Sequence, residues 1–173
     1  TLFPYTTLFR SIGAGNIGTA IARGLVKSGN MDAGKITLTR RHADKLPDLA
    51  AEGFATTTNN AAAIAGHELV VLAVEPGQLD DLLQDIGGVL DPAHHTVISV
   101  VSGATIADMK QHLKEGVAVV RAMPNTAIAV GESMTCLAAS AADAAGLELA
   151  DQIFQSVGIT LVLSLAAAYA LGR

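Results

Sequence analysis

Apolar runs and amphipathic stretches alternate along most of this 173-residue chain. The run at 69–74 is continuously apolar, a pattern typical of a strand that is buried on both faces. The stretch at 78–86 instead places its leucines and Ile86 on one side of a helix. The same two patterns predict further strands at 35–39, 54–56, 96–101, 117–121, 132–138 and 159–163, and helices at 19–26, 43–52, 61–65, 105–113 and 141–155. This alternation predicts an α/β fold with a doubly wound, Rossmann-like, mostly parallel sheet and right-handed crossovers.

A glycine-rich turn precedes the first of these helices and reads Ile12-Gly13-Ala14-Gly15-Asn16-Ile17-Gly18. Its G-x-G-x-x-G spacing suits a dinucleotide: Gly13 allows a tight turn out of a strand, and Gly15 lets a pyrophosphate approach the main chain. Gly18 lets the following helix pack closely on the sheet, with its positive N-terminal end facing the phosphates. The alternative is a glycine-rich turn with no ligand. The helical pattern that follows at once favours the dinucleotide site.

Composition indicates how the core is built and argues against two classes of partner, nucleic acids and metal ions. Half of the residues are apolar but only 3% are aromatic, so the core must be built from Ala, Val, Leu and Ile. The net charge of −5, without a basic stripe, argues against nucleic acid as a partner. The five histidines show no metal-ligand spacing, so no metal is expected.

The cysteine content and the apolar segments bear on the compartment. A single cysteine, Cys136, excludes an internal disulfide and suits a reducing environment. The longest apolar stretch, at 161–171, is well short of the roughly 20 residues that a membrane-spanning helix needs. We therefore expect a cytoplasmic protein without a membrane partner.

The end of the second expected strand bears on the choice of nicotinamide cofactor. A site that prefers NADH usually has an acidic residue about 20 positions after the glycine loop, which accepts hydrogen bonds from the ribose. Here the strand is followed by Arg40 and Arg41, and Asp32 precedes the strand at its other end. Two guanidinium groups suit the 2′-phosphate of NADPH. The alternative is a solvated basic turn, and the sequence favours NADPH.

Later segments extend the comparison to a known family. They are Leu72-Ala73-Val74-Glu75-Pro76, Ile98-Ser99-Val100-Val101-Ser102-Gly103 and, most specific, Val120-Arg121-Ala122-Met123-Pro124-Asn125-Thr126. Together with the glycine loop, these segments resemble pyrroline-5-carboxylate reductase over about residues 12–160. That family reduces the C=N bond of the cyclic imine 1-pyrroline-5-carboxylate to L-proline by hydride transfer from NAD(P)H.

The resemblance implies a role for each matching position. It places the pyrophosphate on Ala14, Gly15, Asn16 and Ile17, the adenosine ribose near Arg40, and the adenosine side of the cofactor near Asn60. It places Ala73, Val74, Glu75 and Pro76 around the ribose and nicotinamide. It implies that Ser102, Met123, Pro124 and Asn125 line the nicotinamide and imine pocket.

Each of these positions also has a purely structural interpretation. Met123 could fill the core, and Pro124 with Asn125 could form a turn. Asn60 could only cap the helix that follows it. Ser102 could belong to a simple strand-to-helix turn.

Three departures from the family pattern change the picture. Glu75 replaces the usual lysine, and because a carboxylate repels phosphates we expect its side chain to face solvent. Residues 1–11 replace the family's short apolar strand and look non-native, since Pro4 and Arg10 suit a central strand poorly. We expect a dinucleotide-binding domain at 12–162 and a divergent tail at 163–173.

The divergent tail lacks the family's helical domain, which dimerises and completes each active site. Catalytic groups are expected in that domain, so none is assigned here. We expect a pyrroline-5-carboxylate reductase, homo-oligomeric when full-length, of which this chain is the NADP-binding part with little activity alone. The alternatives are a non-catalytic NADP-binding module and another imine or β-hydroxyacid reductase. An uncovered apolar surface would also favour self-association.

Overall fold

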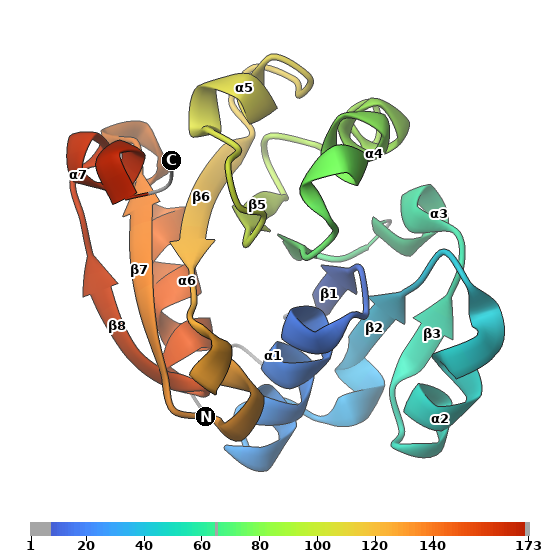
Figure 1. Ribbon diagram of the computed structural model, residues 1–173. Helices are drawn as coiled ribbons and strands as arrows, with labels where there is room; N and C mark the ends of the chain where they lie inside the picture. The colour runs from blue at the N-terminus through green and yellow to red at the C-terminus, as the bar shows by residue number, and fades with distance from the viewer. Residues whose placement is uncertain (1–7, 65, 172–173) are drawn as a thin grey trace.

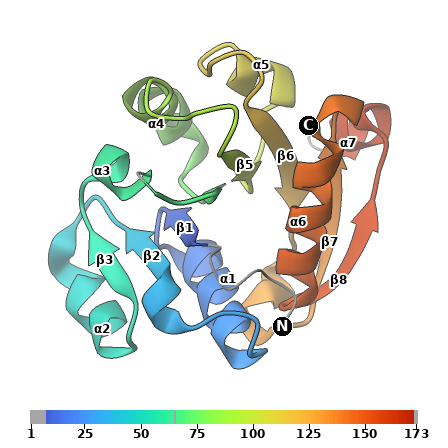
Figure 2. The same ribbon diagram turned by 180° about the vertical axis from the view of Figure 1, so that it is seen from behind.

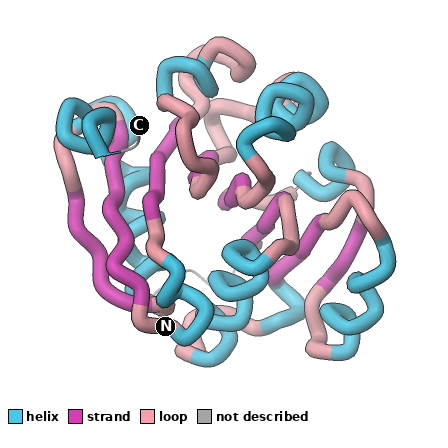
Figure 3. Tube along the Cα trace, viewed as in Figure 1, coloured by secondary structure: helices cyan, strands magenta, loops and turns pink. Residues whose placement is uncertain are grey.

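The computed structural model describes residues 8–64 and 66–171, and they form one twisted sheet with helices on both faces (Figure 1). The strands run in the spatial order β3-β2-β1-β4-β5-β6-β7-β8. Their bounds are β1 Phe9–Ile12, β2 Ile36–Thr39, β3 Ala55–Thr57, β4 Leu69–Leu72, β5 Thr96–Ser99, β6 Ala118–Met123, β7 Ser133–Ala139 and β8 Gly158–Val162. Figure 3 shows how strands and helices alternate along the chain.

Helices connect most of these strands. The α-helices are α1 Asn16–Lys27, α2 Leu46–Ala51, α3 Asn60–Ile64, α4 Leu79–Ile86, α5 Ile106–Lys110, α6 Ala144–Gln155 and α7 Leu165–Leu171. Short 3₁₀ helices are η1 Ala33–Lys35, η2 Ala43–Lys45, η3 Pro76–Gln78, η4 Thr126–Val130 and η5 Ala141–Asp143. The expected helix at 43–52 is thus divided into η2 and α2, and Pro47 lies in the first turn of α2.

The sheet topology confirms the predicted doubly wound, mostly parallel α/β fold. Strands β1 to β6 are all parallel, and the chain reverses only between β6 and β7. Strand β8 then pairs with β7 in parallel. In this topology the carboxyl ends of β1, β2 and β4 meet at one edge of the sheet, which is where ligands of such folds bind.

Two apolar layers hold the helices on the sheet. One contains Phe9, Ile21 and Leu25 and continues to Phe154, so α1 and α6 share a face. The other contains Ile12, Ile64 and Leu83 under α3, α4 and α5. Figure 2, seen from behind, brings α6 in front of β7 and β8. As predicted, aliphatic side chains build most of this core.

The central strand β1 differs most from expectation. It pairs with β2 on one side and β4 on the other, although residues 9–11 fall in the segment expected to lie outside the domain. Phe9 and Ile12 are fully buried and supply the apolar contacts, while the main chain supplies the ladder hydrogen bonds whatever the side chains are. The sheet therefore includes residues 9–11, whereas Pro4 lies outside the described residues.

Strand β1 buries the charged side chain of Arg10, which is energetically unfavourable. The Arg10 side chain is 2% exposed, and its Nη2 lies 3.0 Å from Nε2 of His67. Its Nε and Nη1 atoms have no hydrogen-bond partner among the described residues. Burial lowers the pKa of Arg10 to about 10, because the interior disfavours the charged form.

The chain after residue 162 also packs on the sheet. Helix α7 lies against β7, and Ala168 is buried there. The segment expected to be a divergent tail therefore contributes a helix to the fold as far as residue 171.

Candidate cofactor site

The three glycines of the loop after β1 have distinct steric environments. Gly13 has φ +95°, and a Cβ atom there would lie 2.4 Å from the carbonyl oxygen of Ala73. A Cβ atom on Gly18 would lie 2.4 Å from the carbonyl oxygen of Gly13, in the close contact between α1 and the sheet. A Cβ atom on Gly15 would meet no atom within 4 Å. The turn and the helix packing thus require Gly13 and Gly18, whereas Gly15 faces open space.

The amide groups of this loop divide into two sets. Those of Gly13 and Ala14 both donate to the carbonyl oxygen of Thr39, at 3.2 and 2.8 Å. Within the described part of the chain, the amides of Gly15, Asn16 and Ile17 have no acceptor. Helix α1 also begins without a side-chain cap or an acidic residue in its first turn. Its positive end is therefore open to an anion.

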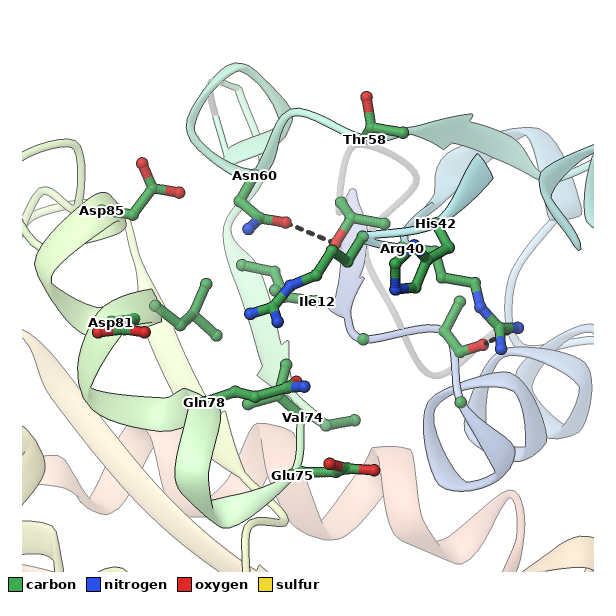
Figure 4. Close-up of a pocket in the computed structure, with 17 residues that line it drawn as sticks. Ile12, Arg40, His42, Thr58, Asn60, Val74, Glu75, Gln78, Asp81 and Asp85 are labelled. Carbon is green, nitrogen blue, oxygen red and sulfur yellow. Dashed lines mark hydrogen bonds between the residues drawn. The ribbon is translucent and has the colours of Figure 1, made fainter. Parts of the chain in front are cut away.

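A groove of about 500 Å³ runs beside this loop, at the carboxyl ends of β1, β2 and β4 (Figure 4). Ile12 and Leu82, both buried, give it an apolar floor together with Val74. It is lined by Ile12, Gly13, Ala14, Gly15, Thr39, Arg40, Arg41, His42, Thr58, Asn60, Ala73, Val74, Glu75, Gln78, Asp81, Leu82 and Asp85. The structure thus brings the predicted glycine loop, both arginines, Asn60 and the segment 73–75 to one cavity.

Charge is unevenly distributed across the groove. Arg40, Arg41 and His42 follow β2 on one side, and Figure 4 shows Asp81 and Asp85 of α4 on the opposite side. An anionic group is therefore attracted to the β2 side and repelled from the α4 side.

Asn60 occupies the position expected of a groove residue. Its Oδ1 accepts a hydrogen bond of 2.8 Å from Oγ1 of Thr39, marked in Figure 4. The start of α3 is instead capped by the preceding residue, because Oδ1 of Asn59 accepts from the amide of Ala62 at 2.9 Å. The capping interpretation thus belongs to Asn59, and the side chain of Asn60 points to the groove.

The loop after β4 forms the rim of the groove. Glu75 is exposed, as expected, although it also lines the cavity. Pro76 is exposed too and begins η3, whose next turn leads into α4. Gln78, Asp81 and Leu82 then line the groove from this side.

The residues expected in the nicotinamide and imine pocket, Ser102, Met123, Pro124 and Asn125, do not line this cavity. Ser102 is exposed after β5, and neither it nor Met123 and Pro124 line the three cavities described in this structure. Asn125 lines a separate cavity of about 470 Å³ with Met134 and Ile159. Its Oδ1 accepts from the amide of Ala127 at 3.1 Å, so its side chain caps η4.

Several groove residues were absent from the sequence prediction. Thr39, His42, Thr58, Gln78, Asp81, Leu82 and Asp85 line the cavity but belong to no recognised motif. What these residues share is their place in the fold. They lie at or just after the carboxyl ends of strands, or on η3 and α4. A second, larger groove of about 800 Å³ lies on the other side of the loop and shares Ala14, Gly15 and Arg40 with the first.

The strand order β3-β2-β1-β4-β5-β6 and the glycine turn before an open helix end define the Rossmann class of α/β proteins. Residues 11–103 match the family described as NADP oxidoreductase coenzyme F420-dependent. The chain belongs to that family.

Individual relatives give a narrower comparison. The chain is 44% identical over 165 residues to pyrroline-5-carboxylate reductase 1 of Dictyostelium discoideum, covering 88% of this chain and 30% of the relative. It is 38% identical over 169 residues to pyrroline-5-carboxylate reductase 2 of the same organism, covering 88% and 56%. The chain thus spans only about a third to a little over half of the length of these curated relatives.

Solved structures agree with the sequence comparison. A pyrroline-5-carboxylate reductase from Coxiella burnetii superposes with a TM-score of 0.88 at 31% identity, covering 96% of this chain and 64% of that one. The NADP-bound pyrroline carboxylate reductase of Plasmodium falciparum gives 0.78 at 19% identity, covering 95% and 65%. The second likeness concerns the fold alone.

Two further properties concern the described residues. None of their helices combines the length and the apolar character needed to cross a bilayer. Their His, Cys, Asp and Glu side chains form no group of three or more that could hold a metal ion.

Proposed function

We propose that this chain is the NADP-binding part of a pyrroline-5-carboxylate reductase. The complete enzyme would transfer hydride from NADPH to the C=N bond of 1-pyrroline-5-carboxylate and release L-proline. The observation that carries the proposal is the 44% identity over 165 residues to a reductase of that name.

The groove supports the cofactor part of the proposal. The amides of Gly15, Asn16 and Ile17 have no acceptor among the described residues, and they lie at the positive end of α1, where a pyrophosphate needs donors. Gly15 leaves the space through which phosphate oxygens would approach the main chain. The apolar floor at Ile12 and Leu82 suits the adenosine, with Asn60 at its edge. Arg40, Arg41 and His42 supply positive charge on the side where a 2′-phosphate would lie.

For this reaction, the protein needs mainly to position the cofactor and the substrate. NADPH supplies the hydride, and a protonated imine is already electrophilic, so no strong nucleophile is needed. What the chain contributes is a fixed phosphate site and a fixed adenosine site, which together hold the cofactor in one orientation. Ala73, Val74, Glu75 and Pro76 would flank the ribose and nicotinamide.

We assign Ser102, Met123, Pro124 and Asn125 to the nicotinamide and imine pocket on the family resemblance. These residues follow β5 and β6, whose carboxyl ends lie at the same edge of the sheet as the groove. A pocket there would need a second wall, so we expect the chain alone to bind NADPH and reduce little imine. The catalytic proton donor stays unassigned.

The fold is compatible with two other functions. A non-catalytic NADP-binding module describes how this chain would behave alone and does not compete with the proposal for the complete protein. Another imine or β-hydroxyacid reductase shares the fold, as a 3-hydroxyisobutyrate dehydrogenase at 15% identity illustrates. The sequence similarity of 38–44% to pyrroline-5-carboxylate reductases favours the first function. A cytoplasmic location and a homo-oligomer complete the proposal.

The experiment is a domain fusion. The chain is joined to the part of the Dictyostelium discoideum reductase that follows the matched segment, and NADPH oxidation is followed with 1-pyrroline-5-carboxylate and with the semialdehyde whose reduction gives 3-hydroxyisobutyrate. We expect proline formation from the first substrate only. A fusion that binds NADPH but reduces no 1-pyrroline-5-carboxylate, while the Dictyostelium enzyme does so in parallel, would contradict the proposal.

A further inference from the structure

The two consecutive arginines after β2 have different surroundings. Arg40 is half-buried, and its Nη1 donates a hydrogen bond of 3.1 Å to the carbonyl oxygen of Ala14. It lines both grooves and so lies beside the glycine loop, between them. Arg41 is exposed and lines only the smaller groove, as does His42. Only one of the two adjacent guanidinium groups is therefore bonded to the loop.

That bond completes a clamp on Ala14. The amide of Ala14 donates to the carbonyl oxygen of Thr39 at 2.8 Å, and the carbonyl oxygen of Ala14 accepts from Arg40, the residue that follows Thr39. Within the described residues, no other side chain donates to or accepts from loop residues 13–18. Because the amides that follow have no acceptor of their own, the clamp on Ala14 helps to fix the direction in which they point, together with the Gly13 bond to Thr39 and the first helical bond of α1.

We infer that Arg40 is a positioning residue that fastens the glycine loop to the end of β2, rather than a group that recognises the 2′-phosphate. The inference rests on the proposed cofactor function. A loop clamp serves the pyrophosphate, which NADPH and NADH share. Arg40 therefore contributes equally to both cofactors, whereas the exposed Arg41, which lines the same groove as His42, is left to act on the 2′-phosphate that only NADPH carries.

A matched pair of variants separates the two roles. Arg40→Gln and Arg41→Gln each remove one guanidinium, and the dissociation constants for NADPH and NADH are measured by fluorescence titration of the whole chain. Arg41→Gln should weaken NADPH binding roughly 10- to 100-fold and leave NADH within about twofold. Arg40→Gln should weaken both cofactors by the same factor, with their ratio unchanged within about threefold. Arg40→Lys, which restores a cationic donor, should recover part of the loss.

A second measurement needs no cofactor. Hydrogen exchange of the amides of Gly13 and Ala14, which donate to the carbonyl oxygen of Thr39, should accelerate about tenfold or more in the unliganded Arg40→Ala chain and stay unchanged in Arg41→Ala. The inference is overturned if Arg40→Gln lowers NADPH affinity selectively, or if Arg40→Ala leaves exchange of the loop unchanged. Failure of the unsubstituted chain to bind either cofactor would instead contradict the proposed function, and the exchange experiment would still decide whether Arg40 clamps the loop.

Discussion

Two regions of the sheet present different surfaces. At the carboxyl ends of β1, β2 and β4, which we call the groove end, main-chain amides, cations and an apolar floor surround a groove. At the sheet edge formed by β8, which we call the β8 end, Met134, Ile159 and Leu161 project from β7 and β8 and are 50%, 62% and 50% exposed. The register of β7 and β8 places Met134 beside Ile159, and alternation along β8 puts Leu161 on the same face. We call these three residues the β8 apolar surface.

The two regions differ in how far other residues of the chain cover them. The opposite face of β8 is covered, since Oγ1 of Thr160 donates to Asp151 of α6. The β8 apolar surface has no such cover among the described residues, and contiguous exposed apolar area usually marks an interaction site or an association hazard. The groove end thus offers charged and hydrogen-bonding groups to a ligand, while the β8 end exposes apolar side chains.

The largest effects should come from the glycine loop. Gly18→Ala places a methyl group 2.4 Å from the carbonyl oxygen of Gly13, so it should lower the free energy of unfolding by roughly 1–3 kcal/mol or more. Gly15→Ala meets no atom and should leave that free energy within about 0.5 kcal/mol, yet weaken NADPH binding at least about tenfold. Urea denaturation and cofactor titration of both variants test this contrast. A Gly15→Ala chain with full affinity would show that the cofactor does not approach the loop there.

The next effect concerns the central strand of the groove end. Arg10→Leu removes a buried charge with two unpartnered nitrogens and should raise the free energy of unfolding by about 1–3 kcal/mol at neutral pH. Arg10→Gln, still polar and buried, serves as the control and should gain less. Loss of stability in Arg10→Leu would mean that the contact with His67 outweighs the desolvation cost.

The same substitution has a pH dependence with a definite sign. Burial lowers the pKa of Arg10 from its ordinary value to about 10, so between about pH 10 and that ordinary value the unfolded chain binds more protons than the folded chain. The free energy of unfolding of the unsubstituted chain therefore rises with pH in that range. The advantage of Arg10→Leu should be full below about pH 10 and shrink above it, as denaturation at pH 7, 9 and 10.5 would show.

A smaller effect on stability, but a large one on association, is expected at the other end. Ile159→Lys with Leu161→Glu breaks the β8 apolar surface and should change the free energy of unfolding by no more than about 0.5 kcal/mol per site. Light scattering over a concentration series should show self-association of the unsubstituted chain and its loss in the double variant. If the unsubstituted chain stays monomeric at every concentration, the β8 apolar surface does not drive self-association and the expected difference between the two regions is wrong.

The smallest effect belongs to an exposed ion pair. Nε and Nη2 of Arg23 on α1 donate to Glu52 at 2.7 and 2.5 Å, and the hydrogen bond lowers the pKa of Glu52. Because both side chains are solvated, Arg23→Gln should cost at most about 0.5 kcal/mol at pH 7. The cost should be present above the ordinary glutamate pKa of 4.5 and vanish as the pH falls below the lowered value. Thermal unfolding at pH 7 and pH 3 checks this.

The sequence predicted the fold well where hydrophobic pattern alone decides it. The apolar run at 69–74 became β4, and the predicted order of strands and helices holds from α1 to β8. Strand β1 was predicted only as the strand from which Gly13 turns and not by its hydrophobic pattern, because Arg10 contradicts the apolar pattern of a central strand. Its neighbours β2 and β4 impose the pairing, and that information lies far from residues 9–12 in the sequence.

The site was predictable only in part for a related reason. Motif spacing located the glycine loop and the arginines, which the structure brings to one groove. It could not show that Arg40 bonds to Ala14, nor that Asp81 and Asp85 of α4 line the opposite side of the same groove, because both depend on how β2 and α4 are placed. Met123 and Pro124, assigned through the resemblance, line none of the described cavities and stay predictions.

The most direct test of the central claim is a calorimetric titration of the chain with NADPH and, in parallel, with NADH. We predict one site per chain, with a dissociation constant for NADPH below about 1 mM and an NADH affinity at least about tenfold weaker. Loss of NADPH binding in Gly15→Ala, with its stability intact, would locate the site at the groove. Equal affinity for the two cofactors, or no binding to a chain shown to be folded, would contradict the account.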